Sequence, residues 1–480
     1  MKLRKYLVGV ICVAMLVLLC GCAPKSNLDP DSPLTINIWH YYNGKQEKAF
    51  NKLVEEFNQT EGKEKGVIVA SSNYGSVSEL GDSVLDAANE KVGSEDMPNI
   101  FAAYSDTAYE IDKLGKVVSL NELFTEEELK EYVPGYLEEG YFRGDDLKIF
   151  PIAKSTEIFM MNETDWDKFA KATGAKRSDL DTIEGITETA AAYYAYTDSL
   201  TPEPDDGQAF FGRDAMANYF IIGAKQLGHE IVSSDDEGNP KIDFDKETIR
   251  KLWDNYYVPY VNGYFMSKGR FRSDDVKMGN IIACVCSTSG STYFPKEIIS
   301  DDETSYKIQS IAQEAPKFKG GENIAVQQGA GLVVTKGTEA ENEASAVFLK
   351  WFTDEDQNIA FSVDSGYMPV KKDATDQEKI LEKTSVKDEQ MKQVIIAAAD
   401  TINNNELYTP KAVENGTSIR NILEYSMSDQ ASADREKIEK LIKSGMSRKE
   451  AVSKFATDKN FEKWYKDTLK ALNEAAEQRK

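Results

Sequence analysis

The sequence predicts an α/β protein built from two lobes, and two observations support this prediction. The chain has 480 residues, which exceeds the roughly 100–200 residues of a typical domain, so more than one hydrophobic core is expected. Residues 34–103 alternate between strand and helix patterns, which is typical of a parallel sheet covered by helices. Polar turns after buried strands recur beyond residue 147. We therefore expect a second unit of the same class.

The first unit is predicted to be strand–helix–strand–helix–strand. Residues 34–39 alternate apolar and polar side chains as a half-buried strand does. Apolar residues between positions 50 and 57 recur at helical spacing and predict an amphipathic helix. Residues 67–70 and 97–103 have strand patterns, with a helix predicted over 80–92 between them. Ligands of such sheets gather beyond the carboxyl ends of the strands, where this chain carries aromatic and polar residues.

The remainder of the chain repeats these elements. Two apolar runs within residues 148–162 flank a polar Lys-Ser-Thr-Glu cluster, and helical patterns follow over 184–257. Residues 281–286 are apolar on both faces and predict a buried strand. A further strand is predicted at 332–335 and a helix at 344–352. From residue 385 onward the pattern is helical and charged.

The N-terminus predicts export and a membrane tether. Positive charges at Lys2, Arg4 and Lys5 precede an apolar run over 7–19, which is the layout of a signal peptide and is too short to span a membrane. The ending Leu-Cys-Gly-Cys22 resembles the lipobox of bacterial lipoproteins, which implies cleavage before a lipidated Cys22. We therefore expect a signal peptide at 1–21 and a proline-rich, lipidated tether at 22–33. An ordinary secretion signal and an uncleaved anchor are the alternatives.

Composition excludes several functional classes. The formal net charge of −24 argues against nucleic acid and anionic lipid headgroups as partners, because both require a basic protein face. Only two histidines occur, and no His-Glu-x-x-His or Cys-x-x-Cys spacing is present, so neither a metal site nor a cofactor is expected. Cys284 and Cys286 lie on one side of the predicted strand at 281–286 and are interpreted as buried thiols.

The order of several short stretches resembles a known family, the extracellular solute-binding proteins of ABC importers, in the group that includes sugar- and glycerol-phosphate-binding lipoproteins. The stretches span roughly residues 34–370 and follow the lipobox-like ending. They are Leu34-Thr-Ile-Asn-Ile-Trp-His, Pro98-Asn-Ile-Phe, Pro151…Ser155-Thr156…Met161-Asn162, Gly329-Ala-Gly-Leu-Val-Val-Thr-Lys, Ala346-Val-Phe-Leu-Lys-Trp-Phe-Thr and Gly366-Tyr-Met-Pro-Val. The tail from about residue 385 to 480 is covered poorly by this resemblance.

The resemblance implies a two-lobed periplasmic-binding-protein-like fold, with a mainly parallel sheet flanked by helices in each lobe and a ligand cleft between the lobes. It implies closure about a hinge when ligand binds. Lobe 1 is predicted to comprise residues 34–153 plus 307–364. Lobe 2 is predicted to comprise 154–306 plus 365–480. The hinge crossings are expected at 154–156, 301–306 and 363–367.

Ligand-binding residues are expected where polar, aromatic or glycine residues adjoin predicted strands or hinge crossings. Aromatic faces and planar polar groups are what a sugar site requires. The candidates are Trp39, His40, Tyr41, Ser105, Asp106, Ser155, Thr156, Glu157, Ser287, Thr288, Ser289, Gly329, Gly331 and Tyr367. No catalytic residue is proposed.

Each candidate also has a structural interpretation. Trp39 could cap the core, Asp106 could cap a helix, and Glu157 could be a hinge residue satisfied by backbone amides. The serine and threonine cluster after residue 286 could cap a helix, and the two glycines could serve a turn. Arg270 and Arg272 are the nearest cations for a phosphate-bearing ligand, although the adjacent aspartates favour surface ion pairs.

The function expected from the sequence is a lipid-anchored solute receptor, with no enzymatic activity, on the outer face of the cytoplasmic membrane. We expect a monomer that captures a mono- or oligosaccharide and delivers it to the membrane subunits of an ABC permease. A binding protein for glycerol-3-phosphate or a related phosphodiester is the second expectation. A secreted glycan hydrolase with paired carboxylates and a receptor that feeds a sensor kinase are the remaining alternatives.

Overall fold

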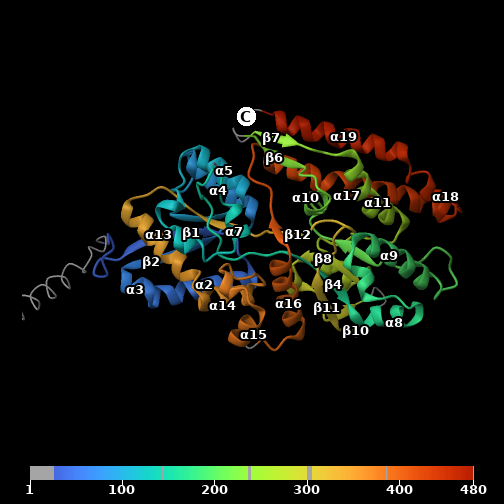
Figure 1. The fold of residues 1–480 in the computed structure, drawn as a ribbon, viewed down its shortest axis with the longest axis horizontal. Coiled ribbons are helices and arrows are strands. Elements are labelled where there is room, and N and C mark those ends of the chain that lie inside the picture. The colour runs from blue at the N-terminus through green and yellow to red at the C-terminus, as the bar shows by residue number, and fades with distance from the viewer. Residues whose placement is uncertain (1–25, 143, 236–238, 300–304, 385, 479–480) are drawn as a thin grey trace, which may run out of the picture.

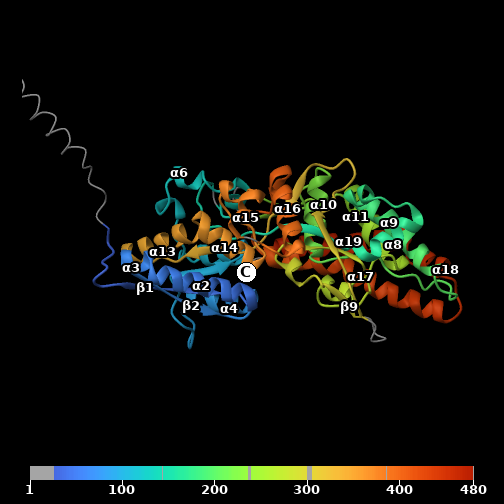
Figure 2. The same ribbon diagram turned by 90° about the horizontal axis from the view of Figure 1, so that it is seen from below.

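The computed structural model describes residues 26–142, 144–235, 239–299, 305–384 and 386–478. Two four-stranded sheets form the centres of two lobes that lie side by side along the long axis (Figure 1, Figure 2). This arrangement confirms the predicted two-lobed α/β fold. Within the described ranges, no helix is long and apolar enough to cross a membrane. The predicted signal peptide and Cys22 lie outside the described residues.

The sheet of lobe 1 has the strand order β13-β3-β1-β2. β1 (Leu34–His40) pairs in parallel with β2 (Val67–Asn73) and with β3 (Ile100–Ala103). β13 (Gly331–Val334) is antiparallel to β3. The predicted parallel unit is therefore confirmed, although the third strand begins only at residue 100. Asn99 instead uses its side-chain oxygen to accept a hydrogen bond from the backbone N–H of Asn37.

Helices cover this sheet because their apolar stripes face it. α2 (Gly44–Gln59) buries the apolar positions between residues 49 and 57 that predicted it. α4 (Val77–Ala88) starts three residues earlier than predicted because Ser76 caps it by accepting from the N–H of Glu79. α5 (Ser105–Lys113), α13 (Glu339–Phe352) and α14 (Glu355–Ser365) also contribute residues to the lobe 1 core.

The sheet of lobe 2 differs from the prediction. Its order is β11-β4-β8-β5, with β11 (Ser310–Glu314) and β8 (Ala283–Ser287) both antiparallel to β4 (Glu157–Asn162). Only β5 (Phe211–Arg213) pairs in parallel, with β8. The prediction of a mainly parallel sheet is wrong for this lobe. β4 leaves the hinge, whereas β8 and β11 run back toward it, so their directions must oppose.

The position of β11 also corrects the predicted lobe boundaries. The predicted boundaries place residues 310–314 in lobe 1, but these residues pair in the lobe 2 sheet. β10 (Ser305–Lys307) is antiparallel to β9 (Glu297–Ile299), so the described part of the predicted crossing at 301–306 belongs to a strand pair; residues 300–304 are outside the described set. The chain returns to lobe 1 after β12 (Ile324–Val326).

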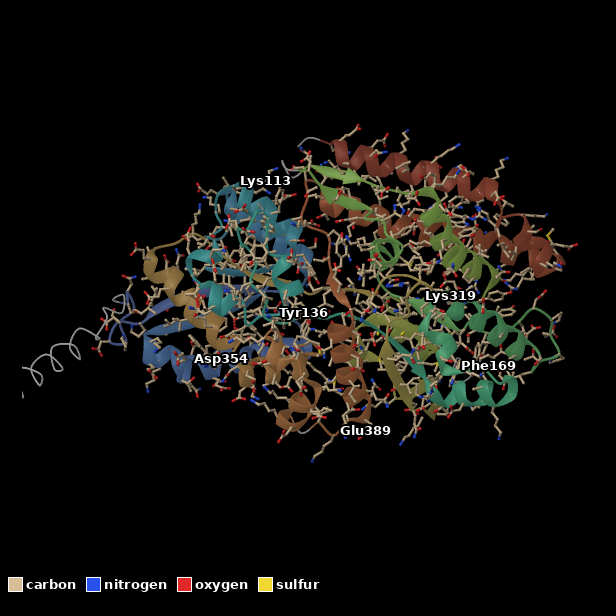
Figure 3. The ribbon with its side chains drawn as sticks, in the orientation of Figure 1. Lys113, Tyr136, Phe169, Lys319, Asp354 and Glu389 are labelled. Carbon is tan, nitrogen blue, oxygen red and sulfur yellow. The ribbon has the colours of Figure 1, made fainter. Side chains whose placement is uncertain are left out.

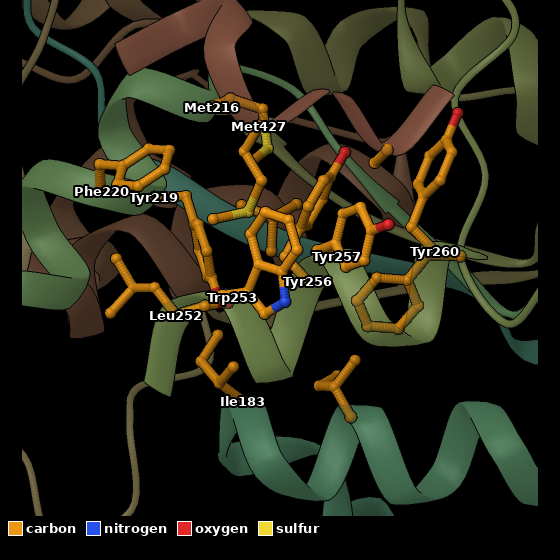
Figure 4. Packing of buried hydrophobic residues seen from close by; sticks show 14 of the residues in the cluster. Ile183, Met216, Tyr219, Phe220, Leu252, Trp253, Tyr256, Tyr257, Tyr260 and Met427 are labelled. Atoms are coloured by element: carbon orange, nitrogen blue, oxygen red, sulfur yellow. The ribbon is translucent and has the colours of Figure 1, made fainter. Parts of the chain in front are cut away.

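The core of lobe 2 is rich in aromatic residues, and apolar residues of the charged C-terminal tail pack into it. Trp253 is 1% exposed and stacks on Tyr257 with ring centroids 3.7 Å apart (Figure 4). Phe461 and Trp464 from the tail join the same cluster. The lobe 2 helices are α8 (Glu163–Thr173), α9 (Ile183–Asp198), α10 (Met216–Gln226), α11 (Lys246–Asn262), α12 (Arg272–Lys277), α16 (Glu389–Asn404), α17 (Gly416–Lys443), α18 (Arg448–Ser453) and α19 (Asp458–Glu477).

Short elements complete the fold. They are α3 (Glu61–Lys65), α6 (Glu126–Leu129), α7 (Pro134–Glu138), α15 (Gln377–Thr384), β6 (Val232–Ser234), β7 (Pro240–Ile242) and β14 (Glu406–Tyr408). β12 and β14 form a parallel pair between the lobes (Figure 1). Cys284 and Cys286 are free and buried in β8, as predicted. The hydrogen bond with Cys286 and, next, burial raise the pKa of the Cys284 thiol.

Candidate functional site

A cavity of about 780 Å³ lies between the lobes and is lined from both. Lobe 1 contributes α4 and the first turns of α5, lobe 2 contributes α10 and α17, and residues 326–328 line it between them. Its apolar members include Leu85, Ile221 and Leu423. The charged members are Asp82, Asp106, Glu110, Glu139, Lys411 and Arg420. A cleft with apolar walls and convergent polar groups is the usual form of a small-molecule site.

Asp106 is the predicted residue that the structure places most directly at this cavity. It lies in the first turn of α5. Loss of water around the carboxyl group raises its pKa to about 6, with Arg420 opposing the rise and Glu139 adding to it. Asp106 also reaches lobe 2, because its Oδ2 lies 3.5 Å from the Thr417 hydroxyl oxygen. The adjacent Gly416 passes so close that a Cβ atom there would overlap Asp106 Oδ1.

A second contact between the lobes lies at the other end of α5. Lys113, labelled in Figure 3, donates a hydrogen bond to Glu414 with a Nζ–Oε2 distance of 2.5 Å. The bond to Glu414 raises the pKa of Lys113. Glu414 precedes α17, so one lobe 1 helix contacts the beginning of one lobe 2 helix at two points. Asp106, Gly416 and Thr417 also line the cavity, so the lobes touch at its wall.

Three tyrosines gather beside the cavity. Tyr104, which lines it, hydrogen-bonds through its side chain with Tyr41, and Tyr41 hydrogen-bonds with Tyr367. Burial raises the pKa of each of the three hydroxyl groups, so all are protonated at neutral pH. On lobe 2, Tyr293 has a 72% exposed side chain. The predicted Tyr41 and Tyr367 are thus brought together, although they come from distant parts of the sequence.

The hinge segments meet at Lys154. Its backbone exchanges hydrogen bonds with Met368, and the neighbouring Ser155 does so with Gln328. The Lys154 side chain is 1% exposed; its Nζ donates to Glu139 and, at 2.6 Å, to the carbonyl oxygen of Gly329. Gly329 has φ of +100°, a conformation that favours glycine. The role of Gly329 that the structure shows is therefore in the hinge.

A second cavity of about 480 Å³ lies within lobe 2, between α10, β11 and α16. Glu157 and Arg213 line it and form a buried ion pair. The Nη2 atom of Arg213 lies 2.5 Å from Glu157 Oε2. The sequence predicts Glu157 to be either a cleft carboxylate or a hinge residue bonded to backbone amides. Its partners are instead the side chains of Arg213 and Asn218. Asn218 lines both cavities.

Several predicted residues lie away from both cavities. Trp39 is 5% exposed in the lobe 1 core and packs on Tyr74. His40 is 1% exposed, and its Nδ1 accepts a hydrogen bond from the N–H of Tyr42; burial lowers its pKa to about 4. Gly331 lies in β13 directly against Ile149. Trp39 and His40 are packed within lobe 1, Gly331 lies within a strand, and none of the three lines either cavity.

The hydroxyl cluster after β8 bonds mainly within itself. Ser287 Oγ accepts from the N–H of Gly290 and lies 3.1 Å from Ser289 Oγ, whereas Ser289, the residue before the short helix Gly290–Tyr293, makes no side-chain capping hydrogen bond. Ser155, Thr156 and Thr288 are at most 3% exposed. Of the residues predicted for the site, Ser105 and Asp106 line the interlobe cavity, and Glu157 lines the second one.

Arg420, Glu139 and Asn218 were not predicted. Arg420 comes from α17 and Glu139 follows α7, and each lies in a helical stretch with no local sign of a site. Arg270 and Arg272, the cations suggested by the sequence, line neither cavity. Arg272 is buried and paired with Asp275 and Asp214. Within the described ranges, no group of three or more histidine, cysteine or acidic residues could hold a metal ion.

Comparison with known proteins gives a consistent result. Residues 52–393 match the family of bacterial extracellular solute-binding proteins. No curated protein sequence matches the chain. Among solved structures, the cyclic α-maltosyl-1,6-maltose binding protein of Arthrobacter globiformis superposes with a TM-score of 0.67 at 16% identity, covering 93% of this chain and 99% of the other.

Two further structures have similar scores. UgpB of Mycobacterium tuberculosis, solved in complex with glycerophosphocholine, gives a TM-score of 0.65 at 15% identity over 92% of this chain and 99% of its own. The maltotriose binding protein of Thermus thermophilus gives a TM-score of 0.58 at 15% identity, again over 92% of this chain and 99% of its own. At these identities the similarity establishes the fold.

Proposed function

Because the chain belongs to the bacterial extracellular solute-binding proteins, we propose that it is a sugar receptor that delivers its ligand to the permease of an ABC importer. The interlobe cavity carries this proposal. Carboxylates such as Asp106 accept hydrogen bonds from pairs of hydroxyl groups, and the Arg420 guanidinium donates to hydroxyl oxygens. Tyr104 and Tyr425 add aromatic surface for the apolar faces of sugar rings.

The charge of the cavity favours a neutral ligand over an anion. Four carboxylate residues line it against the two basic residues Lys411 and Arg420, and a phosphate group would have to approach these carboxylates at a cost in free energy. Isothermal titration with maltotriose, mannobiose and glycerophosphocholine tests the assignment. We expect binding of a saccharide with a rise in melting temperature, and exclusive binding of glycerophosphocholine would contradict it.

A glycerophosphodiester is the second candidate ligand, and Arg420 is the observation that favours it. The guanidinium faces the cavity and could receive a phosphate oxygen. If this candidate is correct, Arg420→Gln abolishes glycerophosphocholine binding, whereas Lys411→Gln, at the edge of the same cavity, weakens it less. Saccharide binding by the wild-type protein with no glycerophosphocholine signal would exclude this candidate.

The proposal also includes a lipid tether, delivery to a permease and the absence of enzymatic turnover. We propose that the mature protein begins at Cys22, is lipidated there, and is confined as a monomer near its permease, where effective concentration is high. Cys22→Ser should release the protein into the medium, and retention in the membrane would contradict the tether. Incubation with fluorogenic glycosides should yield no product, because the proposed role is binding; turnover would favour a glycan hydrolase.

A further inference from the structure

The Asn218 side chain connects three separate segments at the wall of the interlobe cavity. It is 1% exposed and lies on α10. Its Nδ2 donates to Glu157 Oε1 and to Gln328 Oε1, both at 2.9 Å. Its Oδ1 accepts a hydrogen bond of 2.7 Å from the guanidinium nitrogen Nη2 of Arg420. The amide is thereby linked to β4, to the hinge and to the long helix α17.

The chemistry of these partners dictates the orientation of the amide. A carboxylate such as Glu157 only accepts hydrogen bonds, and a guanidinium such as Arg420 only donates them. Rotating the Asn218 amide by 180° would direct its oxygen at Glu157 and its NH2 group at Arg420, and both contacts would be repulsive. The Glu157–Arg213 ion pair holds Glu157 in place from the other side. Asn218 therefore offers its oxygen to Arg420 in a single orientation.

The backbone before Asn218 is strained. Ala215, between β5 and α10, has φ of +50° and ψ of 72°, a left-handed conformation that is unfavourable for a non-glycine residue and concentrates at functional sites. The N–H of Asn218 donates to the carbonyl oxygen of this residue at 3.0 Å. The strained turn thus lies one helical turn from the amide and sets where α10 begins.

Arg420 otherwise has few constraints. Its side chain is on the exposed surface of α17 and lines the cavity. Among the described residues, it takes part in no ion pair within 4.0 Å, and its one hydrogen bond is the bond to Asn218. A guanidinium carries five N–H donors, so most of them remain available. Arg420 and Asp106 line the same cavity, and the positive charge of Arg420 opposes the rise in the pKa of the Asp106 carboxyl group.

We infer that Asn218 is a positioning residue that holds the Arg420 guanidinium at the wall of the cleft, so that its remaining N–H donors face the bound ligand. The inference rests on the proposed function, because it assigns Arg420 to ligand recognition. Without the Asn218 oxygen, a long flexible side chain on an exposed helix samples many rotamers, and ordering it on binding then reduces affinity. The bond to Gln328 ties the same amide to the hinge.

Affinity measurements with maltotriose, mannobiose and glycerophosphocholine test this role. Asn218→Ala should weaken the probe that binds wild-type protein by about 10-fold. Arg420→Ala should weaken it at least as much, and the double variant should bind no more weakly than Arg420→Ala alone, because the two residues act through one contact. Multiplicative losses in the double variant would overturn the inference.

Asn218→Asp separates positioning from stability. The carboxylate keeps an acceptor for Arg420 but meets Glu157 and loses both donated hydrogen bonds. The melting temperature should therefore fall more than in Asn218→Ala, while affinity should fall less. The matched control is Asn460→Ala, which removes an amide that bonds Tyr257, Asp434 and Phe455 in lobe 2; it should lower stability and leave affinity unchanged. Affinity that follows melting temperature across the series would overturn the inference.

A ligand-free measurement distinguishes failure of this inference from failure of the proposed function. The Arg420 Nε–Hε signal in ¹⁵N NMR, assigned by its disappearance in Arg420→Lys, should show an ordered side chain in wild-type protein and a mobile one in Asn218→Ala. An unchanged signal would overturn the positioning role. If wild-type protein binds none of the three probes but the NMR result is as expected, the choice of ligand is wrong and the positioning stands.

Discussion

Lys154 and Glu139 form an ion pair at the point where the hinge segments meet. The Lys154 Nζ lies 2.5 Å from Glu139 Oε2, and the two side chains are 1% and 4% exposed. Gln327 Nε2 donates to the same carboxylate oxygen at 2.9 Å. Both charges are thus removed from water, and each depends on the other for compensation. The pair fixes the relative position of segments that connect the two lobes.

Removing one partner of this pair should be strongly destabilising. Lys154→Met leaves the Glu139 carboxylate buried with only the Gln327 amide, so we expect a loss of about 3–5 kcal/mol in the free energy of unfolding, measured by urea denaturation. The double variant Lys154→Met/Glu139→Leu should recover much of this loss, because no unpaired charge remains. A double variant less stable than both single ones would contradict the interpretation.

His40 predicts a specific pH dependence of stability. Its folded pKa of about 4 lies below the value of about 6.5 of an exposed histidine, so between these pH values the unfolded chain binds more protons. The contribution of His40 to stability is complete above pH 6.5 and is lost as the pH falls toward 4, by about 3 kcal/mol. His40→Asn, which retains an acceptor for Tyr42, should lack this decline. Parallel stability–pH curves for the wild-type protein and the His40→Asn variant would contradict this prediction.

Gly416 allows the lobes to approach, because a Cβ atom there would overlap Asp106 Oδ1. Gly416→Ala should separate α5 from α17 and open the cleft, which small-angle X-ray scattering would detect as a larger radius of gyration. The affinity for ligand should decrease, because closure then costs more free energy. Ser418→Ala, on the exposed side of the same turn, serves as the control and should change neither quantity. Equal scattering from the two variants would contradict the prediction.

The Lys113–Glu414 contact should contribute weakly to closure. Its side chains are 41% and 27% exposed, and partly exposed ion pairs couple by about 1 kcal/mol or less. A double-mutant cycle with Lys113→Ala and Glu414→Ala should give a coupling of this size in ligand binding, and it should shrink at high salt. A larger coupling that is insensitive to salt would show that the pair is more buried in solution.

Thr156 and Thr288 face each other where β4 and β8 meet the hinge, with the Thr288 N–H 2.9 Å from the Thr156 carbonyl oxygen. Neither hydroxyl oxygen has a hydrogen-bond partner among the described residues. Thr156→Val should therefore change stability by less than about 1 kcal/mol, since no bond is lost.

Thr353→Val is the matched control for this substitution. Its hydroxyl is bonded to Tyr132 and Leu349, and its loss should cost about 1–2 kcal/mol in thermal or urea denaturation. A loss of that size at Thr156 would show that its hydroxyl group has a partner in solution.

Much of the fold was predictable because local patterns carry it. The strand at residue 34, the amphipathic helix after residue 44 and the buried strand at 283–287 follow from periodicities within single segments. The antiparallel pairing in lobe 2 was not predictable in this way. The directions of β4, β8 and β11 depend on which strand leaves the hinge and which return to it, and this is a property of the whole chain path.

The site was predicted only in part for a similar reason. Asp106 follows a strand end, where the sheet topology alone places it near a ligand. Trp39 and His40 follow the same logic and are nevertheless core residues, because β1 extends to residue 40 and its last side chains remain covered. Arg420 and Asn218 lie inside helices, and no neighbouring residue marks them.

By itself, the sequence determined the two-lobed α/β class and the family, because strand and helix periodicities and the order of short landmarks are local properties of the chain. Tertiary structure alone decided which charged and polar groups meet at the cleft and at the hinge segments beside it. Lys154 meets Glu139 and Asn218 meets Arg420 only after segments separated by 15 and 202 positions in the chain are packed together. The energy of such contacts depends on burial and distance, which no local pattern in the sequence records.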